Sequence, residues 1–193
     1  QTGKYFTGRQ EIHKILKKLE KNKSDDHAYG WWPGSKNNTA ITIYVADALN
    51  MAAKQDYKAD FNDDILWHLR SMLRINQATT LEKLTVMRLL IESDYNDYDN
   101  EDINSQLTKF STSTMNTIEK LAFIRVKQLL KQEYQLSDVI SSASRTTLGG
   151  MYWVGNHNEL FCNDLQATTL AYTILKNDSA GKSYLPLVRA YFY

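Results

Sequence analysis

The sequence has 193 residues, which is long enough to bury one substantial core. Its 23 Lys and Arg side chains nearly balance its 22 Asp and Glu side chains, so no basic excess favours a nucleic-acid partner. Aromatic residues make up 11% of the chain, which excludes the disordered class, and no apolar run approaches the ~20 residues that a membrane span needs.

Glycine and proline are absent between Ser35 and Leu148. So long an interval favours helices joined by short polar turns, because an all-β chain would need frequent Gly-rich or Pro-rich turns. Apolar residues also recur at helical spacing, and the predicted class is all-α. The predicted helices cover residues 9–22, 38–55, 61–76, 80–93, 99–110, 116–134, 136–147, 164–177 and 183–193.

Helix start signals support several of these boundaries. Thr79 stands three residues before Glu82, and Asn116 stands three residues before Glu119. Both pairs have the spacing of a capping box, in which each residue's side chain bonds the other's backbone N–H. Asp60 is predicted to cap the third helix, since Asp is favoured at helix starts.

Two kinds of helix are predicted. Segment 38–55 is apolar on nearly all sides and should be buried on most of them, whereas segment 9–22 has a single apolar stripe. The opposite face of segment 9–22 is basic and is interpreted as a solvated outer face, with no partner required. Its lysines, with one beyond the helix, are Lys14, Lys17, Lys18, Lys21 and Lys23. Alternation of buried and one-sided helices predicts two concentric layers.

A short motif occurs twice. An aromatic and glycine-rich segment with Trp32 precedes one apolar helix, and a similar segment with Trp153 precedes another, 121 residues later. Six predicted helices lie between them, which makes three hairpins of roughly 40 residues, a period typical of stacked helical hairpins.

These two ends of the chain carry a family resemblance. The near end is the segment Tyr29–Gly34 followed by Thr39–Val45; the far end is Trp153, Gly155, Asn163 and Ala167–Tyr172. Together they resemble the thioester domain of bacterial alpha-macroglobulins. The resemblance implies an α/α toroid. About nine helices are predicted where a closed toroid needs about twelve, so the toroid is expected to be incomplete.

The resemblance also implies a function. The chain, taken as a single domain over 1–193, would be a non-catalytic structural and interaction module of a protease-trapping endopeptidase inhibitor. Proteases or other proteins would be its partners, through a longer parent molecule with β-sandwich domains. A periplasmic, cell-envelope or extracellular location would follow the family. The family's Cys-x-Glu-Gln thioester motif is missing from this sequence.

The chain's far end suggests a piece cut from that parent, because residues 185–193 form an apolar helical pattern without a stop signal. Missing neighbours would leave apolar faces open near Leu185, Val188 and Tyr191, so self-association is predicted.

The single cysteine, Cys162, does not fit the thioester pattern. Three positions later stands Leu165, and the nearest glutamine is Gln166. Unpaired cysteines are among the most buried residue types, so Cys162 is predicted to be an inert core thiol.

Two acidic motifs have competing interpretations. Asp60, Asp63 and Asp64 resemble the acidic motifs of terpenoid cyclases, but their order is wrong and helix capping is favoured. The run Asp94–Asp102 is rich in oxygen ligands, yet it lacks the turn glycine and the Glu at the twelfth position of an EF-hand. A solvated loop with Asp99 as a cap is the favoured interpretation.

No catalytic, cofactor-binding or metal-binding residue is assigned. The four histidines have no metal-ligand spacing, and no Gly-x-Ser-x-Gly elbow occurs. They are His13, His27, His68 and His157. Two rival functions stay open: an α/α-toroid enzyme of the terpenoid cyclase or prenyltransferase kind, and a small-molecule binder of the cobalamin-carrier kind. A correctly spaced carboxylate cluster or zinc triad would favour the enzyme.

Overall fold

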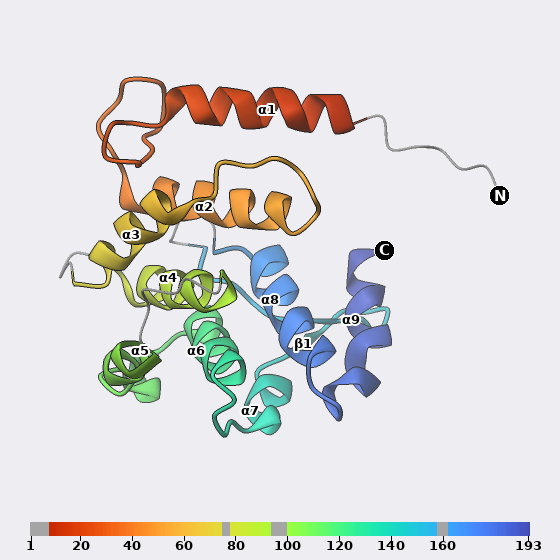
Figure 1. The fold of residues 1–193 in the computed structure, drawn as a ribbon. Coiled ribbons are helices and arrows are strands. Elements are labelled where there is room, and N and C mark those ends of the chain that lie inside the picture. Colours follow the sequence, from red (N-terminus) through yellow and green to blue (C-terminus); the bar gives the residue numbers. More distant parts are fainter. Residues whose placement is uncertain (1–7, 75–77, 94–99, 158–161) are drawn as a thin grey trace. The chain divides into compact units, whose positions relative to one another are not determined.

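The computed structural model describes residues 8–74, 78–93, 100–157 and 162–193 (Figure 1). Within those ranges the chain is predominantly helical, which confirms the all-α prediction. Its contacts divide into two compact units, Gln1–Asn96 and Asp97–Tyr193, called unit 1 and unit 2 below. Each unit is described by itself.

Unit 1 contains four described helices. They are α1 (Arg9–Asn22), α2 (Thr39–Ala53), α3 (Asp63–Met72) and α4 (Thr80–Glu92). Helices α2, α3 and α4 pack against one another. Their facing side chains form the core of the unit, which includes Leu49, Ile65, Leu69, Leu84 and Met87, all almost fully buried. Burial of such side chains contributes about 1.5–3 kcal/mol each, so this trio of helices carries most of the unit's stability.

Helix α1 buries none of its residues. Its lysines Lys14, Lys17, Lys18 and Lys21 are exposed, as predicted for an outer face. Lys23 differs, because it pairs with the carboxylate of Asp60. The helix also meets the loop after α2, where the ring of His13 lies 5.7 Å from that of Tyr57.

Helix α2 is less enclosed than predicted. Thr42, Ile43, Ala46, Leu49 and Asn50 are buried on one side. On another side Tyr44, Ala48 and Met51 form an exposed stripe, and Met51 is 63% exposed. An apolar composition all round therefore did not mean burial all round, because only one face of α2 packs on α3 and α4.

The described part of unit 2 combines α-helices with short 3-10 helices and two short strands. They are α5 (Asn100–Leu107), η1 (Thr112–Thr114), α6 (Thr117–Leu129), α7 (Leu136–Ser141), β1 (Ser144–Arg145), β2 (Met151–Tyr152), α8 (Asp164–Lys176), η2 (Gly181–Tyr184) and α9 (Leu185–Phe192). Helix α8 packs on α6, on α9 and on β2, and it buries Ala167, Ala171, Ile174 and Leu175. The core of unit 2 therefore centres on α8.

The helix predicted over 136–147 is wrong in its second half. Helix α7 ends at Ser141, and a short antiparallel hairpin follows, with Ser144 opposite Tyr152. The Thr146 backbone N–H donates to the Gly150 carbonyl (2.8 Å), and the Gly150 N–H donates to the Thr146 hydroxyl oxygen (2.8 Å). These hydrogen bonds satisfy the backbone in a hairpin and not in a helix. Thr146 and Thr147 are β-branched, and β-branched residues have a low preference for helix.

The sixth helix also ends earlier than predicted. Lys131 adopts a positive φ of 56°, the Lys131 N–H donates to the Gln128 carbonyl, and the Gln132 N–H donates to the Lys127 carbonyl. This is a Schellman C-cap, which normally uses glycine. A lysine in that position carries no sequence signal for a helix end.

The predicted caps are confirmed in two places and wrong in a third. Capping boxes form at Thr79 with Glu82 and at Asn116 with Glu119. Asn62, and not Asp60, caps α3, accepting the Ile65 N–H at 3.3 Å. The Asp60 carboxylate is engaged by Lys23 and by the Asn62 side-chain amide instead.

Candidate functional site

The loop between α1 and α2, which carries the first copy of the repeated motif, is anchored by Tyr29. The Tyr29 backbone N–H donates to the Thr42 hydroxyl oxygen at 2.9 Å, and the Asn38 N–H donates to the Tyr29 carbonyl at 2.9 Å. Tyr29 is 2% exposed and Thr42 is 1% exposed. The loop is thus joined to the first turns of α2 by buried hydrogen bonds, which are costly to break.

Beyond this anchor the same loop presents two large aromatic side chains to solvent. Trp31 is 48% exposed and Trp32 is 71% exposed. A small hydrogen-bonded turn holds them, because the Trp32 N–H donates to the Ser35 hydroxyl oxygen (3.2 Å) and the Ser35 N–H donates to the Trp32 carbonyl (3.0 Å). The two tryptophans therefore project from an ordered turn.

Trp153, in the second copy of the motif in unit 2, is buried, unlike Trp31 and Trp32. Its backbone N–H donates to the Thr168 hydroxyl oxygen of α8 at 3.1 Å, and its indole N–H donates to the Val139 carbonyl at 2.8 Å. Trp153 and Thr168 are both completely buried. Both N–H groups of the residue thus have a hydrogen-bond acceptor, as a buried tryptophan indole usually does.

The two copies of the motif therefore share one construction. In each, the backbone N–H of a buried aromatic residue in the loop bonds a buried threonine of the following helix, from Tyr29 to Thr42 and from Trp153 to Thr168. The sequence pairing of Trp32 with Trp153 is wrong, since Trp32 is exposed and Tyr29 holds the equivalent place. The aromatic residue precedes its threonine by 13 residues in the first copy and by 15 in the second, so a comparison at constant spacing does not align Tyr29 with Trp153.

A close backbone approach accompanies each anchor. A Cβ atom added to Gly155 would lie 2.0 Å from the Cys162 carbonyl oxygen, and one added to Gly30 would lie 2.6 Å from the Lys36 carbonyl oxygen. No side chain fits at either position, because the chain folds back on itself there. The glycines of the motif thus have a structural role in both copies.

Cys162 is buried, as predicted, with 2% of its surface exposed. The neighbouring Gln166 belongs to a capping box, in which its side-chain oxygen accepts the Asn163 N–H at 3.0 Å. Leu165, three positions after Cys162, is 54% exposed. The glutamine nearest in sequence to the thiol is therefore part of the cap that begins α8.

The three carboxylates of the cyclase-like motif have separate neighbours. Asp60 binds Lys23 and Asn62, while Asp64 lies 3.8 Å from Nε2 of His27. Asp63 is exposed in the first turn of α3, where a carboxylate complements the helix dipole. They do not converge on one point as carboxylates that protonate a substrate would.

The second acidic motif falls largely outside the described residues, which exclude 94–99 and with them the predicted cap Asp99. Helix α5 begins at Asn100. In the part of the chain that the structure describes, no group of three or more His, Cys, Asp or Glu side chains could hold a metal ion. The His157 imidazole instead lies 3.1 Å from the Asp164 carboxylate.

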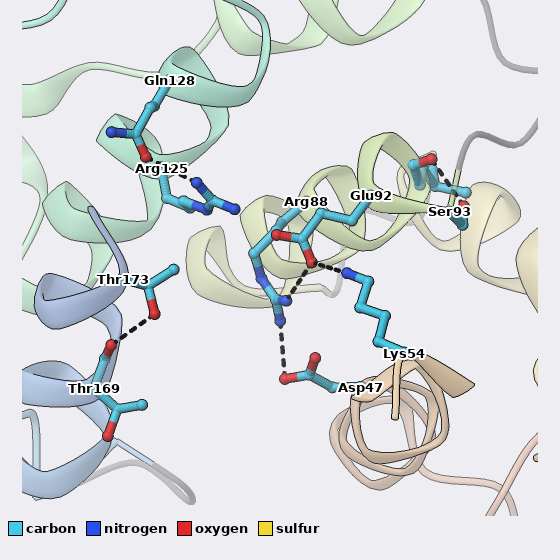
Figure 2. Close-up of polar contacts among 10 residues, drawn as sticks. Asp47, Lys54, Arg88, Glu92, Ser93, Arg125, Gln128, Thr169 and Thr173 are labelled. Carbon is cyan, nitrogen blue, oxygen red and sulfur yellow. Dashed lines mark hydrogen bonds and ion pairs between the residues drawn. The ribbon is translucent and has the colours of Figure 1, made fainter. Parts of the chain in front are cut away.

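Sequence reasoning did not find a charged network between α2 and α4 (Figure 2). Arg88 contacts Asp47 at 2.9 Å and Glu92 at 3.3 Å, and Lys54 contacts Glu92 at 2.9 Å. The i,i+4 spacing of Arg88 and Glu92 was the one local signal available. Two cations and two anions compensate one another, so the network leaves no net charge for a ligand.

A hollow of about 360 Å³ lies beside this network in unit 1. It is lined by residues of α2, α3, α4 and the loop before α3, namely Asn50, Ala53, Lys54, Phe61, Asn62, Asp63, Leu66, Glu92 and Ser93. Nδ2 of Asn50 is buried and has no hydrogen-bond partner among the described residues. The same atom is shielded from solvent, so the hollow does not offer it to a ligand.

In unit 2 a second polar network ties α6 to the end of α8. Gln128 donates to the Ile174 carbonyl (3.1 Å) and to the Tyr134 hydroxyl oxygen (3.0 Å), while its own oxygen accepts from Arg125 (2.8 Å; Figure 2). Tyr134 in turn donates to Asp178 at 2.6 Å. Burial, followed by this bond, raises the pKa of Tyr134, and the bond lowers the pKa of Asp178. Both pKa values thus move away from pH 7, and the network stabilises the neighbouring elements.

Comparison with known proteins adds no relative. No family model, no curated protein and no solved structure matches the chain. Among the described residues, no helix is long and apolar enough to cross a membrane.

Proposed function

We propose that the chain is a non-catalytic structural and interaction module of a protease-trapping protein of the alpha-macroglobulin kind. The observation that carries the proposal is the repeated loop-to-helix anchor. In both units an aromatic and glycine-containing loop bonds a buried threonine of the next helix, from Tyr29 to Thr42 and from Trp153 to Thr168. These are the two segments on which the resemblance to the alpha-macroglobulin thioester domain rests.

The proposed architecture is part of an α/α toroid, with each anchored helix belonging to its inner layer. Support comes from the burial of Ala46 and Leu49 in α2 and of Ala171 and Ile174 in α8, in contrast to α1, which buries no residue. Small residues on a buried helix permit close packing between layers. The proposed location, outside the cytoplasm or in the cell envelope, rests on the resemblance alone.

An interaction role is supported by the two tryptophans on the ordered turn. Trp31 and Trp32 are large apolar side chains that remain exposed although the loop beneath them is held by buried hydrogen bonds. Tryptophan is strongly enriched at the centres of protein interfaces. We infer that the partners are endopeptidases or other protein surfaces.

Binding to endopeptidases tests this function directly. The purified chain would be mixed with serine, cysteine, aspartic and metallo-endopeptidases whose active sites are blocked by small inhibitors, and complexes would be measured by calorimetry and by size-exclusion chromatography. We expect a complex with at least one class that dissociates in denaturing electrophoresis, because this sequence has no Cys-x-Glu-Gln for covalent capture. Absence of binding to all four classes would contradict the proposal.

A further inference from the structure

Helix α1 is attached to the rest of unit 1 along one side. The ring of His13 lies 5.7 Å from that of Tyr57, in the loop after α2, and the guanidinium carbon of Arg9 lies 5.8 Å from the centre of the same Tyr57 ring. No residue of α1 is fully buried. Its half-buried residues are Ile12, Leu16 and Leu19. The side of the helix that carries these apolar residues therefore faces the unit.

The opposite side of α1 carries four exposed lysines. Lys14, Lys18 and Lys21 follow one another at intervals of four and three positions, and Lys17 stands three positions after Lys14. Residues at these intervals are neighbours on a helix surface, so the four lysines make one patch, called the lysine face. Lys14 stands two positions after Ile12, a rotation of about 200°, so the lysine face is turned away from the half-buried residues.

No carboxylate pairs with the lysine face in the part of the chain that the structure describes. The ion pairs of unit 1 involve the cations Lys23, Lys54, Arg88 and His27, and none involves a lysine of the face. Residues 1–8, which precede the helix, contain no Asp or Glu. The lysine face therefore keeps its positive charge.

The acidic residues nearest in sequence lie at the margins of this face. Glu20 stands seven positions after His13, so it shares the side of the helix that contacts Tyr57. Glu11 lies in the first turn, where a carboxylate complements the helix dipole, and it sets one negative charge against four positive ones. Asp25 and Asp26 belong to the turn that follows the helix, which the Ser24 N–H closes by donating to the Ala28 carbonyl at 3.0 Å.

Ile15 adds an apolar side chain to the border of the lysine face. It is 56% exposed, and it stands three positions before Lys18 and four before Leu19. The side chain therefore lies between the cationic patch and the half-buried stripe. A single exposed isoleucine needs no explanation by itself, but here it adjoins a cationic helix surface.

We propose that the lysine face of α1 binds the surface of a membrane that contains anionic phospholipids, with the helix lying along the surface and Ile15 entering the headgroup layer. Clusters of four to eight basic residues on an amphipathic helix are typical of binding to anionic lipids, and charge complementarity selects such a surface. A plane of headgroups can contact all four lysines of one straight helix at once.

The sequence alone requires no partner for the lysine face. The structure adds its lack of ion pairs, its place opposite the attached side of α1, and the exposure of Ile15. Nucleic acid is less favoured as the occupant, because the whole chain has no basic excess. The inference uses neither the loop anchors nor the family resemblance, so it goes beyond the proposed function.

Co-sedimentation with lipid vesicles tests the proposal. The purified chain would be mixed with vesicles of phosphatidylcholine alone and with vesicles of phosphatidylcholine and phosphatidylglycerol in equal amounts. We expect binding to the anionic vesicles only. The bound fraction should fall as NaCl is raised from about 0.01 M to about 1 M, because the Debye length shortens from about 30 Å to about 3 Å. Equal binding to both kinds of vesicle, or binding to neither, would contradict the proposal.

Charge variants show whether the lysine face is responsible. Lys14→Gln with Lys18→Gln should weaken binding by about 30-fold, because each lysine near an anionic membrane contributes about fivefold. Glutamine at all four positions should abolish binding, whereas arginine at all four should preserve it. The matched control changes the net charge equally in unit 2, by Lys→Gln at four exposed positions, and should leave the affinity unchanged. These are Lys120, Lys131, Lys176 and Lys182.

Further measurements separate a membrane from other occupants. Ile15→Ser should weaken binding to the anionic vesicles by several-fold, because the isoleucine no longer enters the headgroup layer. Circular dichroism confirms that every variant is folded. The proposal is overturned if Ile15→Ser or glutamine at all four lysines leaves vesicle binding unchanged. It is also wrong if double-stranded DNA or a polyglutamate peptide binds more tightly than the anionic vesicles at equal salt.

Discussion

Two buried threonine hydroxyl groups decide how the loops are held. Thr168 accepts the Trp153 backbone N–H, and both residues are completely buried. Thr168→Val keeps the shape but leaves that N–H without a partner, which should lower the free energy of unfolding by about 1–3 kcal/mol. Chemical denaturation measures the change.

The neighbouring Thr169 supplies the control. It is exposed, and its hydroxyl donates to the Leu165 carbonyl of its own helix at 2.7 Å. Thr169→Val should change stability by less than about 0.5 kcal/mol. An equal loss in both variants would show that valine at these positions acts through helix propensity and not through the loop anchor.

Tyr29 shows the opposite situation, because its hydroxyl is buried and has no hydrogen-bond partner among the described residues. Burial, with smaller contributions from Asp60 and Glu20, raises the pKa of Tyr29 to about 12. Removing an unsatisfied buried hydroxyl avoids its desolvation, so Tyr29→Phe should be neutral or stabilising by up to about 1 kcal/mol at pH 7.

The same residue predicts a pH dependence. A pKa raised above the unfolded value of about 10 gives stability that is present below pH 10 and is lost as the pH rises towards 12, since only the unfolded state ionises in that interval. Urea unfolding at pH 9 and pH 11 should therefore show a smaller loss for Tyr29→Phe than for the wild type. A destabilised variant at pH 7 would indicate an undetected partner for the hydroxyl.

At the scale of elements, helix caps give a graded prediction. Thr79 of α4 and Asn116 of α6 each form a capping box, whereas Gln135 precedes α7 without a side-chain cap bond. Thr79→Ala and Asn116→Ala should each cost about 0.5–2 kcal/mol, while Gln135→Ala should cost almost nothing. Thermal unfolding of the three variants distinguishes these outcomes, and a uniform effect would contradict the assignment of the caps.

At the scale of the whole molecule, we predict that folding needs no divalent metal. The described residues contain no converging group of metal-ligating side chains, and the charges between α2 and α4 compensate one another. The melting temperature should stay unchanged when EDTA or millimolar calcium is added, because only a ligand that binds the native state raises its stability. A rise of several degrees with calcium would assign a role to the acidic run Asp94–Asp102.

The prediction of self-association through the last helix is weakened in one respect. Val188 is completely buried within unit 2, where α9 packs on β2 and α8, so it is not part of an open apolar face. Leu185 and Tyr191 are half-buried. An exposed apolar stripe occurs instead on α2, where Met51 is 63% exposed.

Features that depend on a few neighbouring residues could be predicted from the sequence. The helical class, the capping boxes at Thr79 and Asn116, and the exposed lysines of α1 follow from periodicity and from hydrogen bonds that span three or four positions. The burial of Cys162 follows from its residue type. The sequence alone therefore determined most helices and the outward face of α1.

Only the tertiary structure decided which residues anchor the loops and compensate the charges. Tyr29 reaches Thr42 across 13 residues, and Arg88 meets Asp47 from another helix. Exposed Trp32 and buried Trp153 look alike in the sequence, because burial depends on which helix the loop folds against. Side-chain contacts between distant segments have no fixed spacing, and for that physical reason no periodic or local pattern could have revealed them.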